Sequence, residues 1–261
     1  MKNLVIALAA LVSCFTLIST VSAAPILWGD PQVFTGPDDI ITGGPLVVAV
    51  NQGGPAQFDD IDPFGNPFTA DPIDVNTSSG VITFEARNDF PRAPFNSNGT
   101  SDNPIVDYGD AGFNEVINQA AWADSNFGGG PDVGGNESPW AINVYGLEVG
   151  TQYQIQFFVS DARFGAGTQN RTQTIDDLEG NSVTLKMDGG EQESVVGTFT
   201  ADAGTQLFRF EGGVSPLGEP ALATPHLNAY VLRQVPEAST FVLSVLGYLG
   251  AMILLVGNRR K

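Results

Sequence analysis

The residues best suited to binding a sugar are three aromatic side chains and a polar group that follows a strongly alternating segment. A pyranose ring stacks on an aromatic face, and planar polar groups hydrogen-bond its hydroxyls. The candidates for the stacking platform are Trp122, Trp140 and Tyr145. The candidates for the polar rim are Asp161, Arg163, Asn170 and Arg171. The sequence therefore predicts a glycan-binding site around the loop that holds these four polar residues.

A second interpretation of the same residues is structural. Asp161 and Arg163 are two positions apart, so on a continuing strand both side chains point to one face and can form a bidentate pair. That pair and Arg171 could serve only to hold the loop in place. The tryptophans would then belong to the core, because tryptophan is usually well buried. The residue types leave both interpretations open.

Calcium is the one inorganic ligand that the sequence suggests, and no other cofactor is expected. Asp60, Asp62 and Asp71 occupy positions 1, 3 and 12 of a 12-residue loop with Gly65 at position 6, as in an EF-hand. Phe64 stands at a ligand position, so an ordinary aspartate-rich turn is the alternative. The many acidic residues also leave room for a calcium ion elsewhere.

Catalytic chemistry has little support in the sequence, and we predict that the protein is not an enzyme. His226 is the single histidine, and no Gly-x-Ser-x-Gly motif occurs, so neither a serine triad nor a histidine metal centre is indicated. We expect His226, beside Pro225, to be a surface or turn residue. Glycoside hydrolysis needs only two carboxylates, but no signature selects a pair. A polysaccharide-processing hydrolase remains an alternative.

The segment 151–160 gives the clearest signal for the elements that must position these residues. Apolar side chains fall at every second residue from Tyr153 to Val159, and Gln152, Gln154 and Gln156 alternate with the first of them. This period of two predicts a strand with one face in the core and the other in water. Similar strands are predicted at 46–50, 81–86, 140–145, 183–187, 195–200, 206–210 and 227–232.

These strands predict an all-β fold, an antiparallel jelly-roll sandwich. Helical spacing of apolar residues occurs at 113–122, which we expect to be a helix that caps the sandwich. Segments rich in proline, glycine, asparagine and aspartate at 55–74, 88–110 and 126–139 predict long loops.

The charge balance excludes nucleic acid as a partner. The chain has 11 Lys and Arg against 29 Asp and Glu, for a net charge of −18. A surface this negative repels phosphate backbones and attracts divalent cations or basic partners. High net charge also keeps an exported protein soluble.

Both ends of the chain predict export and a membrane anchor. Lys2, an apolar stretch at 4–18 and small residues before Ala24 predict a signal peptide at 1–23, cut by signal peptidase between Ala23 and Ala24. Cys14 follows a sequence like a lipoprotein box, which is the alternative. Because Cys14 is the single cysteine, a chain cut at Ala24 contains no disulfide.

The C-terminal region 235–261 contains an uncharged apolar segment at about 238–256, followed by Arg259, Arg260 and Lys261. This length suits a single transmembrane helix, and the flanking bases place the body at 24–234 outside. A buried C-terminal helix is the alternative. The sequence thus predicts an exported single-pass membrane protein.

The residues Val235-Pro236-Glu237, the apolar segment and the terminal bases together resemble the PEP-CTERM sorting signal, with Ala238 in place of the family's second proline. The resemblance implies that an exosortase recognises Pro236 and Glu237, cuts the tail and releases the body to the envelope or extracellular matrix.

A second resemblance covers about 110–233, carried by the segments 146–163, 170–173, 196–202 and 227–233. They are similar to secreted PEP-CTERM proteins with galactose-binding-like or malectin-like jelly rolls. This resemblance implies a carbohydrate-binding-like β-sandwich and carries over no activity. Together with the sorting signal, it leads us to expect a non-enzymatic module associated with exopolysaccharide. The alternative is a structural or adhesive matrix protein without a small-ligand site.

Overall fold

The structure is a computed structural model in which most of the described residues belong to β-strands, which confirms the predicted all-β class. It describes residues 25–52, 71–87, 95–96, 107–122, 140–161, 171–187, 192–213 and 225–236. The predicted signal peptide at 1–23 and the predicted transmembrane segment at 238–256 lie outside these ranges. Within them, no helix has the length and apolar composition needed to cross a bilayer.

The strands are β1 (Leu27–Trp28), β2 (Gln32–Val33), β3 (Leu46–Asn51), β4 (Ile73–Thr77), β5 (Gly80–Ala86), β6 (Phe95–Asn96), β7 (Gln119–Trp122), β8 (Trp140–Tyr145), β9 (Gln152–Val159), β10 (Thr172–Asp176), β11 (Ser182–Lys186), β12 (Glu193–Thr200), β13 (Thr205–Gly212), β14 (His226–Leu227) and β15 (Ala229–Gln234). A 3₁₀ turn, η1 (Pro37–Asp39), and one helix, α2 (Ala111–Asn118), complete the described elements.

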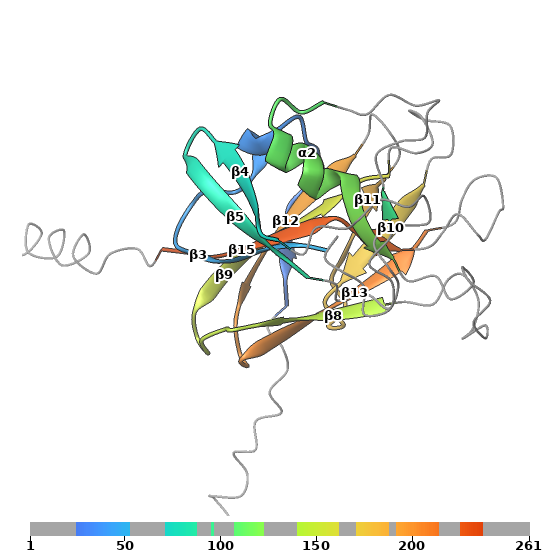
Figure 1. Ribbon diagram of the computed structural model, residues 1–261. Coiled ribbons are helices and arrows are strands. Elements are labelled where there is room, and N and C mark those ends of the chain that lie inside the picture. The colour runs from blue at the N-terminus through green and yellow to red at the C-terminus, as the bar shows by residue number, and fades with distance from the viewer. Residues whose placement is uncertain are drawn as a thin grey trace, which may run out of the picture.

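The strands form a large sheet, a four-stranded sheet and a short three-stranded sheet. The large sheet has the order β1-β12-β9-β15-β3-β5-β4, with β2 also paired to β12. The four-stranded sheet, called the small sheet below, has the order β11-β10-β13-β8. Neighbours are antiparallel, as predicted, except β3 and β5. These two strands are parallel, so the prediction of a wholly antiparallel sandwich is wrong at this pair. Figure 1 shows β8 and β13 on one side of β9, β15 and β3, and α2 on the other.

The main core lies between the large sheet and the small sheet, which makes the fold a sandwich. Phe157 of β9 packs edge-on against Phe208 and Phe210 of β13, with ring centroids 5.0 and 5.4 Å apart. Each edge-to-face aromatic pair contributes about 0.5–1.5 kcal/mol beyond its buried area. Tyr153, Ile155 and Val159 belong to the same core, as their alternation predicts.

A second core covers the opposite face of the large sheet, where the sequence predicted water. Phe158 of β9 packs against Phe34 and Phe113, and Phe113 comes from α2. On the same face, Gln156 is buried; it accepts a bond from the Ile41 amide and donates to the Asp39 carbonyl, both at 2.9 Å. The prediction that this face of β9 is wet is therefore wrong at Gln156, because η1 and α2 cover it.

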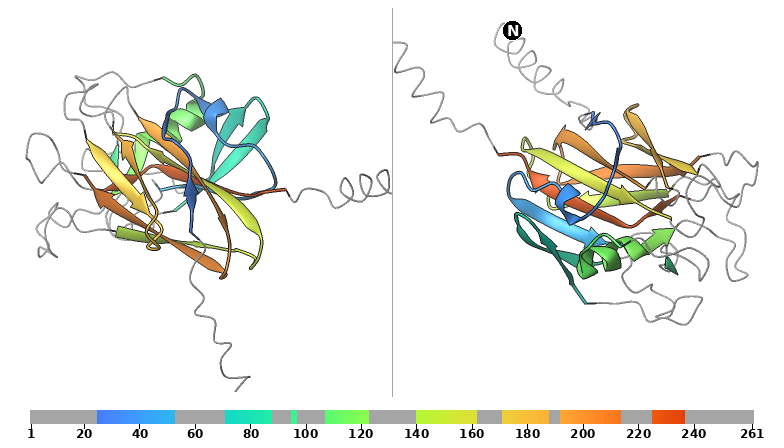
Figure 2. Two further views of the ribbon diagram at one scale, coloured as in Figure 1. Left: turned by 180° about the vertical axis from the view of Figure 1, so that it is seen from behind. Right: turned by 90° about the horizontal axis from the view of Figure 1, so that it is seen from above.

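The predicted helix exists but is shorter than 113–122. Asp110 caps its start by accepting a bond from the Phe113 amide at 2.8 Å. The helix ends at Asn118, and Gln119 is extended because β7 pairs with β6 and β14. Gly112 allows the close approach to β4, since a Cβ there would lie 2.0 Å from the Asp74 carbonyl oxygen. The helix covers a sheet, as predicted (Figure 2).

Candidate functional site

The aromatic residues predicted as a stacking platform do not share one face. Trp140 begins β8 and is half-buried against the main core, whereas Tyr145 ends β8 and is 60% exposed. An odd spacing along one strand places side chains on opposite faces, so these two cannot stack on the same sugar. Trp122 lies at the end of β7, and only its backbone belongs to the described part of the chain.

The polar residues predicted as a rim are placed only in part. Asp161 is fully buried, and Arg171 is 4% exposed. Arg171 Nη1 donates to Asp161 Oδ2 in a buried ion pair. Arg163 and Asn170 lie outside the described residues. The carboxylate of Asp161 therefore faces Arg171 in the interior rather than solvent.

The prediction that His226 is a surface or turn residue is wrong. His226 is 1% exposed and lies on β14, opposite Trp122 of β7. Its Nε2 is 3.0 Å from the Ser160 carbonyl oxygen, and its amide donates to Gln173 Oε1 at 2.9 Å. Pairing of β14 with β7 draws the ring into the interior, which proximity to Pro225 in the sequence did not reveal.

The predicted calcium ligands are not brought together in the part of the chain that is described. Asp71 is exposed at the start of its range, and Asp60 and Asp62 fall in the gap before it. Among the described residues, no three His, Cys, Asp or Glu side chains converge to hold a metal ion.

Of the predicted processing residues, Pro236 alone is described, and it is exposed. It directly follows β15, because the Val235 amide still donates to the Gln152 carbonyl at 2.8 Å. Ala23, Ala24 and Glu237 lie outside the described ranges.

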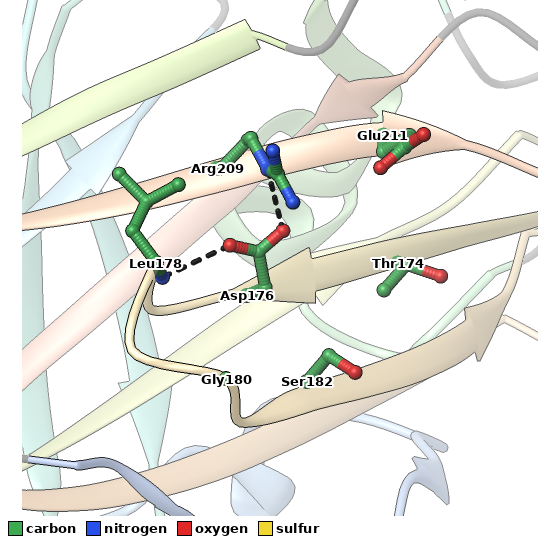
Figure 3. A pocket seen from close by; sticks show the side chains of 7 residues that line it. All are labelled: Thr174, Asp176, Leu178, Gly180, Ser182, Arg209 and Glu211. Atoms are coloured by element: carbon green, nitrogen blue, oxygen red, sulfur yellow. Dashed lines mark hydrogen bonds and ion pairs between the residues drawn. The ribbon is translucent and has the colours of Figure 1, made fainter.

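A cavity of about 390 Å³ lies on the outer face of the small sheet, and we refer to it as the outer hollow. Figure 3 shows that its lining comes from β10, β13, β11 and the turn between β10 and β11. The lining residues are Thr174, Asp176, Leu178, Gly180, Ser182, Arg209 and Glu211.

Strand register determines which side chains meet in the outer hollow. Across the three strands, Asp176 is opposite both Arg209 and Ser182, and Thr174 is opposite both Glu211 and Thr184. The alternate residues Ile175 and Phe210 point inward and are fully buried. Because side chains alternate along a strand, the core packing of the inward set fixes the polar set on the outside.

Arg209 and Asp176 form the central polar contact of the outer hollow. Arg209 Nε donates to Asp176 Oδ2 at 2.6 Å, and the two side chains are 41% and 8% exposed. The hydrogen bond to Asp176 raises the pKa of Arg209, and the negative charge of Glu211 adds to this effect. With Nε engaged, the guanidinium keeps its two terminal amino groups for hydroxyl groups of a ligand.

The turn after β10 brings an apolar side chain to the outer hollow in a left-handed backbone conformation. Leu178 has φ of 64° and is the one non-glycine residue with positive φ among those described. Its amide donates to Asp176 Oδ1 at 2.9 Å, and its side chain is 47% exposed. This conformation costs an L-residue roughly 1–2 kcal/mol. Because the Leu178 side chain is half exposed, its partial burial offsets little of that cost.

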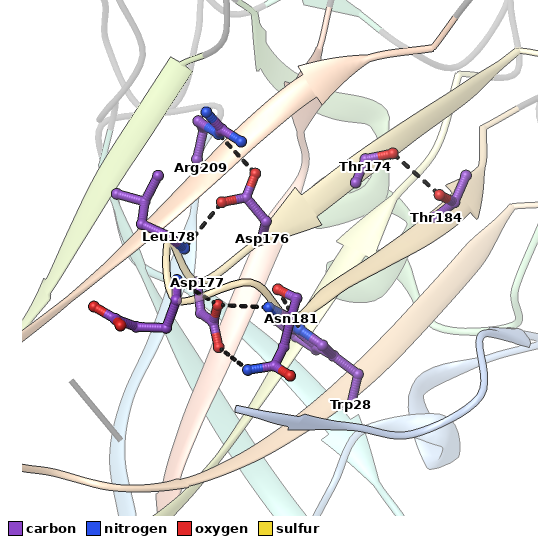
Figure 4. A network of polar contacts seen from close by, with 9 residues as sticks. Trp28, Thr174, Asp176, Asp177, Leu178, Asn181, Thr184 and Arg209 are labelled. Carbon is purple, nitrogen blue, oxygen red and sulfur yellow. Dashed lines mark hydrogen bonds and ion pairs between the residues drawn. The ribbon is translucent and has the colours of Figure 1, made fainter. Parts of the chain in front are cut away.

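Asp177 holds the same turn against the N-terminal segment (Figure 4). Its carboxylate accepts bonds from the amides of Ile26, Glu179 and Asn181 at 2.8, 2.9 and 3.1 Å. Burial raises the pKa of Asp177, but these bonds outweigh it and leave the pKa below its ordinary value. Asp177 therefore connects the turn that carries Leu178 to the N-terminal segment.

The outer hollow presents guanidinium donors, carboxylate acceptors, hydroxyls and one apolar side chain, a combination suited to a polyhydroxylated ligand. Tyr145 lies on the same outward face of the small sheet, opposite Thr205. The sequence reasoning missed the whole lining of the hollow. The sequence signal is weak, because Ile175 is the single apolar residue among the five residues Thr172 to Asp176.

No protein-family model matches the sequence, and no curated protein matches it. Among solved structures, the chain is similar to a plant receptor-like kinase, FER, at 12% identity and a TM-score of 0.33, covering 74% of this chain and 50% of that one. It is also similar to a chain in a complex of the plant peptide RALF23 with FER and LLG2, at 13% identity and a TM-score of 0.33, covering 79% of this chain and 55% of that one. The chain thus spans about half the length of these structures.

Proposed function

We propose that this protein is an exported, non-enzymatic β-sandwich that binds carbohydrate through the outer hollow. The hollow combines the planar guanidinium of Arg209, the carboxylate of Glu211 and the hydroxyl of Ser182 on one rigid sheet. Sugar recognition needs such fixed polar groups together with an apolar surface for the C–H face of the ring. Leu178 supplies that surface.

The conformation of Leu178 is the observation that carries this proposal. A strained backbone persists where the surrounding structure enforces it, and such residues cluster at ligand sites. Here Asp176 and Asp177 fix the turn on both sides of Leu178. The result is an apolar side chain held beside the Arg209–Asp176 pair, where a sugar ring can contact both.

The ends of the chain support an envelope location as part of the same proposal. The sandwich, with jelly-roll connectivity, would be released from its signal peptide at Ala23 and held by the apolar segment at 238–256. Exosortase would recognise Pro236 and Glu237. Pro236 is exposed immediately after β15, which makes the start of this motif accessible on the folded protein.

A glycan array with the purified full-length protein in detergent tests the binding proposal. We expect binding to polysaccharide fragments, and we expect Arg209→Ala to weaken it at least tenfold. Arg87→Ala is the matched control, since Arg87 is also a half-exposed arginine beside a carboxylate, Glu85, but lies on β5 outside the hollow. Absence of binding with and without calcium would leave a structural or adhesive matrix protein, and release of sugar products would indicate a hydrolase.

Mass spectrometry of the protein recovered from the producing cells tests the sorting proposal. A mature chain that begins at Ala24 and lacks the residues beyond Glu237 is expected. Retention of the C-terminal segment would instead make the protein a permanent single-pass membrane protein.

A further inference from the structure

We infer that the sugar bound in the outer hollow carries a free amino group, so that the ligand class is an unacetylated hexosamine within a glycan. This inference rests on the proposed function and adds the chemistry of the ligand. The evidence for this inference is the set of charges that line the hollow and the way in which they are paired.

Two of the three charged side chains in the hollow neutralise each other. Arg209 donates to Asp176 at 2.6 Å, and the second oxygen of Asp176 accepts the Leu178 amide at 2.9 Å. The third, Glu211, is exposed and acts on Arg209 through its charge, but among the described residues no hydrogen bond or ion pair joins it to a partner. The hollow therefore keeps one unpaired negative charge.

Besides Arg209, the lining of the hollow near Glu211 offers a hydroxyl group. Thr174 lies opposite Glu211, and its Oγ1 is 3.0 Å from the Oγ1 of Thr184 on the next strand. An ammonium group next to Glu211 could donate to the carboxylate and to the Thr174 hydroxyl together. Ammonium groups carry three donors, and bonds between ionised partners are stronger than neutral ones.

The spacing of the hollow matches a single sugar ring. Glu211 and Arg209 are two residues apart on one face of β13 (Figure 3), which separates them by roughly 7 Å along the strand. A ring with its amino group at Glu211 therefore places other hydroxyls at the terminal amino groups of Arg209. Its apolar face would contact Leu178.

The net negative charge of the protein disfavours an acidic sugar as the ligand. The chain has a net charge of −18, so a uronic acid or sulfated sugar would approach against the overall field and meet Glu211 in the hollow. A neutral N-acetylated sugar keeps the hydroxyl contacts but leaves the Glu211 carboxylate without a countercharge.

Calorimetric titration of the full-length protein in detergent with glucosamine oligomers and N-acetylglucosamine oligomers of equal length tests this inference. Acetylation removes the positive charge and leaves the ring hydroxyls. We expect the glucosamine oligomer to bind about fivefold more tightly, a preference typical of a partly exposed ion pair, and to lose that preference in 1 M salt.

Glu211→Gln should remove the preference and keep binding of the acetylated oligomer. Glu85→Gln is the matched control, because Glu85 is also exposed on a strand but lies on β5. It removes the same charge and should keep the preference, which separates Glu211 from general attraction of a basic sugar to an acidic protein.

Equal binding of both oligomers, or tighter binding of the acetylated one, would overturn the inference but leave carbohydrate binding intact. A preference that survives Glu211→Gln, or is lost in Glu85→Gln, would also overturn it. Absence of binding to both oligomers and to every other glycan would instead contradict the proposed function itself.

Discussion

Asp176 and Arg209 lie directly opposite each other on β10 and β13, and the Arg209 Nε donates to Asp176 Oδ2 at 2.6 Å. The aspartate uses its other oxygen to accept the Leu178 amide. One carboxylate thus connects two strands of the small sheet with the turn that carries the exposed leucine. The geometry of the outer hollow therefore depends on this carboxylate.

Replacing either partner should affect binding more than stability. Asp176→Asn should lower the free energy of unfolding by about 1 kcal/mol, because Arg209 is 41% exposed and surface ion pairs contribute little. Glycan affinity should fall more strongly, since Arg209 loses its fixed orientation. Urea denaturation and calorimetry on the same preparation separate the two effects. A loss of several kcal/mol without any change in affinity would contradict this assignment.

Leu178→Gly should stabilise the protein and weaken glycan binding. Glycine adopts a φ of 64° without the steric cost that leucine has, so the free energy of unfolding should rise by roughly 1 kcal/mol. Loss of the side chain removes the apolar contact for the sugar. Thermal denaturation and titration measure both changes, and Leu178→Asn, which also tolerates this conformation, should behave alike. A destabilised variant would show that Leu178 is not strained.

Acid should destabilise the protein partly through Asp177. Hydrogen bonds hold the pKa of this carboxyl below its ordinary value of 3.8, despite burial. The stabilisation is therefore complete above about pH 4 and is lost as the pH falls through the lower folded-state pKa. Asp177→Asn should lower the stability at pH 7 and flatten its decrease below pH 4. Urea denaturation between pH 7 and pH 2 measures how the free energy of unfolding depends on pH in the wild type and in Asp177→Asn. The same dependence in both proteins would rule out a contribution of Asp177 to acid destabilisation.

The buried pair of Asp161 and Arg171 should be essential for folding. Both side chains are removed from water, so Arg171→Met would take the paired cation away from a buried carboxylate and cost about 3–5 kcal/mol. The double substitution Asp161→Leu with Arg171→Met should recover part of that loss. Denaturation of the single and double variants measures the coupling. A single variant of unchanged stability would mean that the pair is accessible to solvent.

Alternation predicted several strands whose two faces differ, but it missed β4, where buried Ile73 and Val75 alternate with exposed residues. β8 begins and ends at the predicted residues, and β3, β5, β11, β12 and β13 lie within two residues of their predicted bounds. β10 was not predicted, because Thr172, Gln173 and Thr174 give no apolar period. The burial of Gln156 was also missed, since a glutamine on an expected wet face becomes internal only when η1 folds over it.

The outer hollow could not be derived from the sequence for a different reason. Asp176, Ser182 and Arg209 come together only through the pairing of β10 with β11 and β13, and register is a tertiary property. The site predicted at the loop around Asp161 and Arg171 could not be tested from the sequence for the same reason, because the contacts of these residues depend on tertiary structure. Nothing in the spacing of Asp161 and Arg171 indicated that both would turn inward and pair.

The position of β15 has a mechanical consequence. This strand lies between β9 and β3 in the large sheet and is antiparallel to both. The chain runs directly from β15 through Val235 to Pro236, two residues before the proposed anchor at 238–256. A pull on the C-terminal end of β15 along the strand axis would load the bonds to both neighbours at once, in shear, whereas a pull on an edge strand would load only one row of bonds. Under the proposed anchoring, the body would therefore be held through a central strand of the large sheet and not through an edge strand.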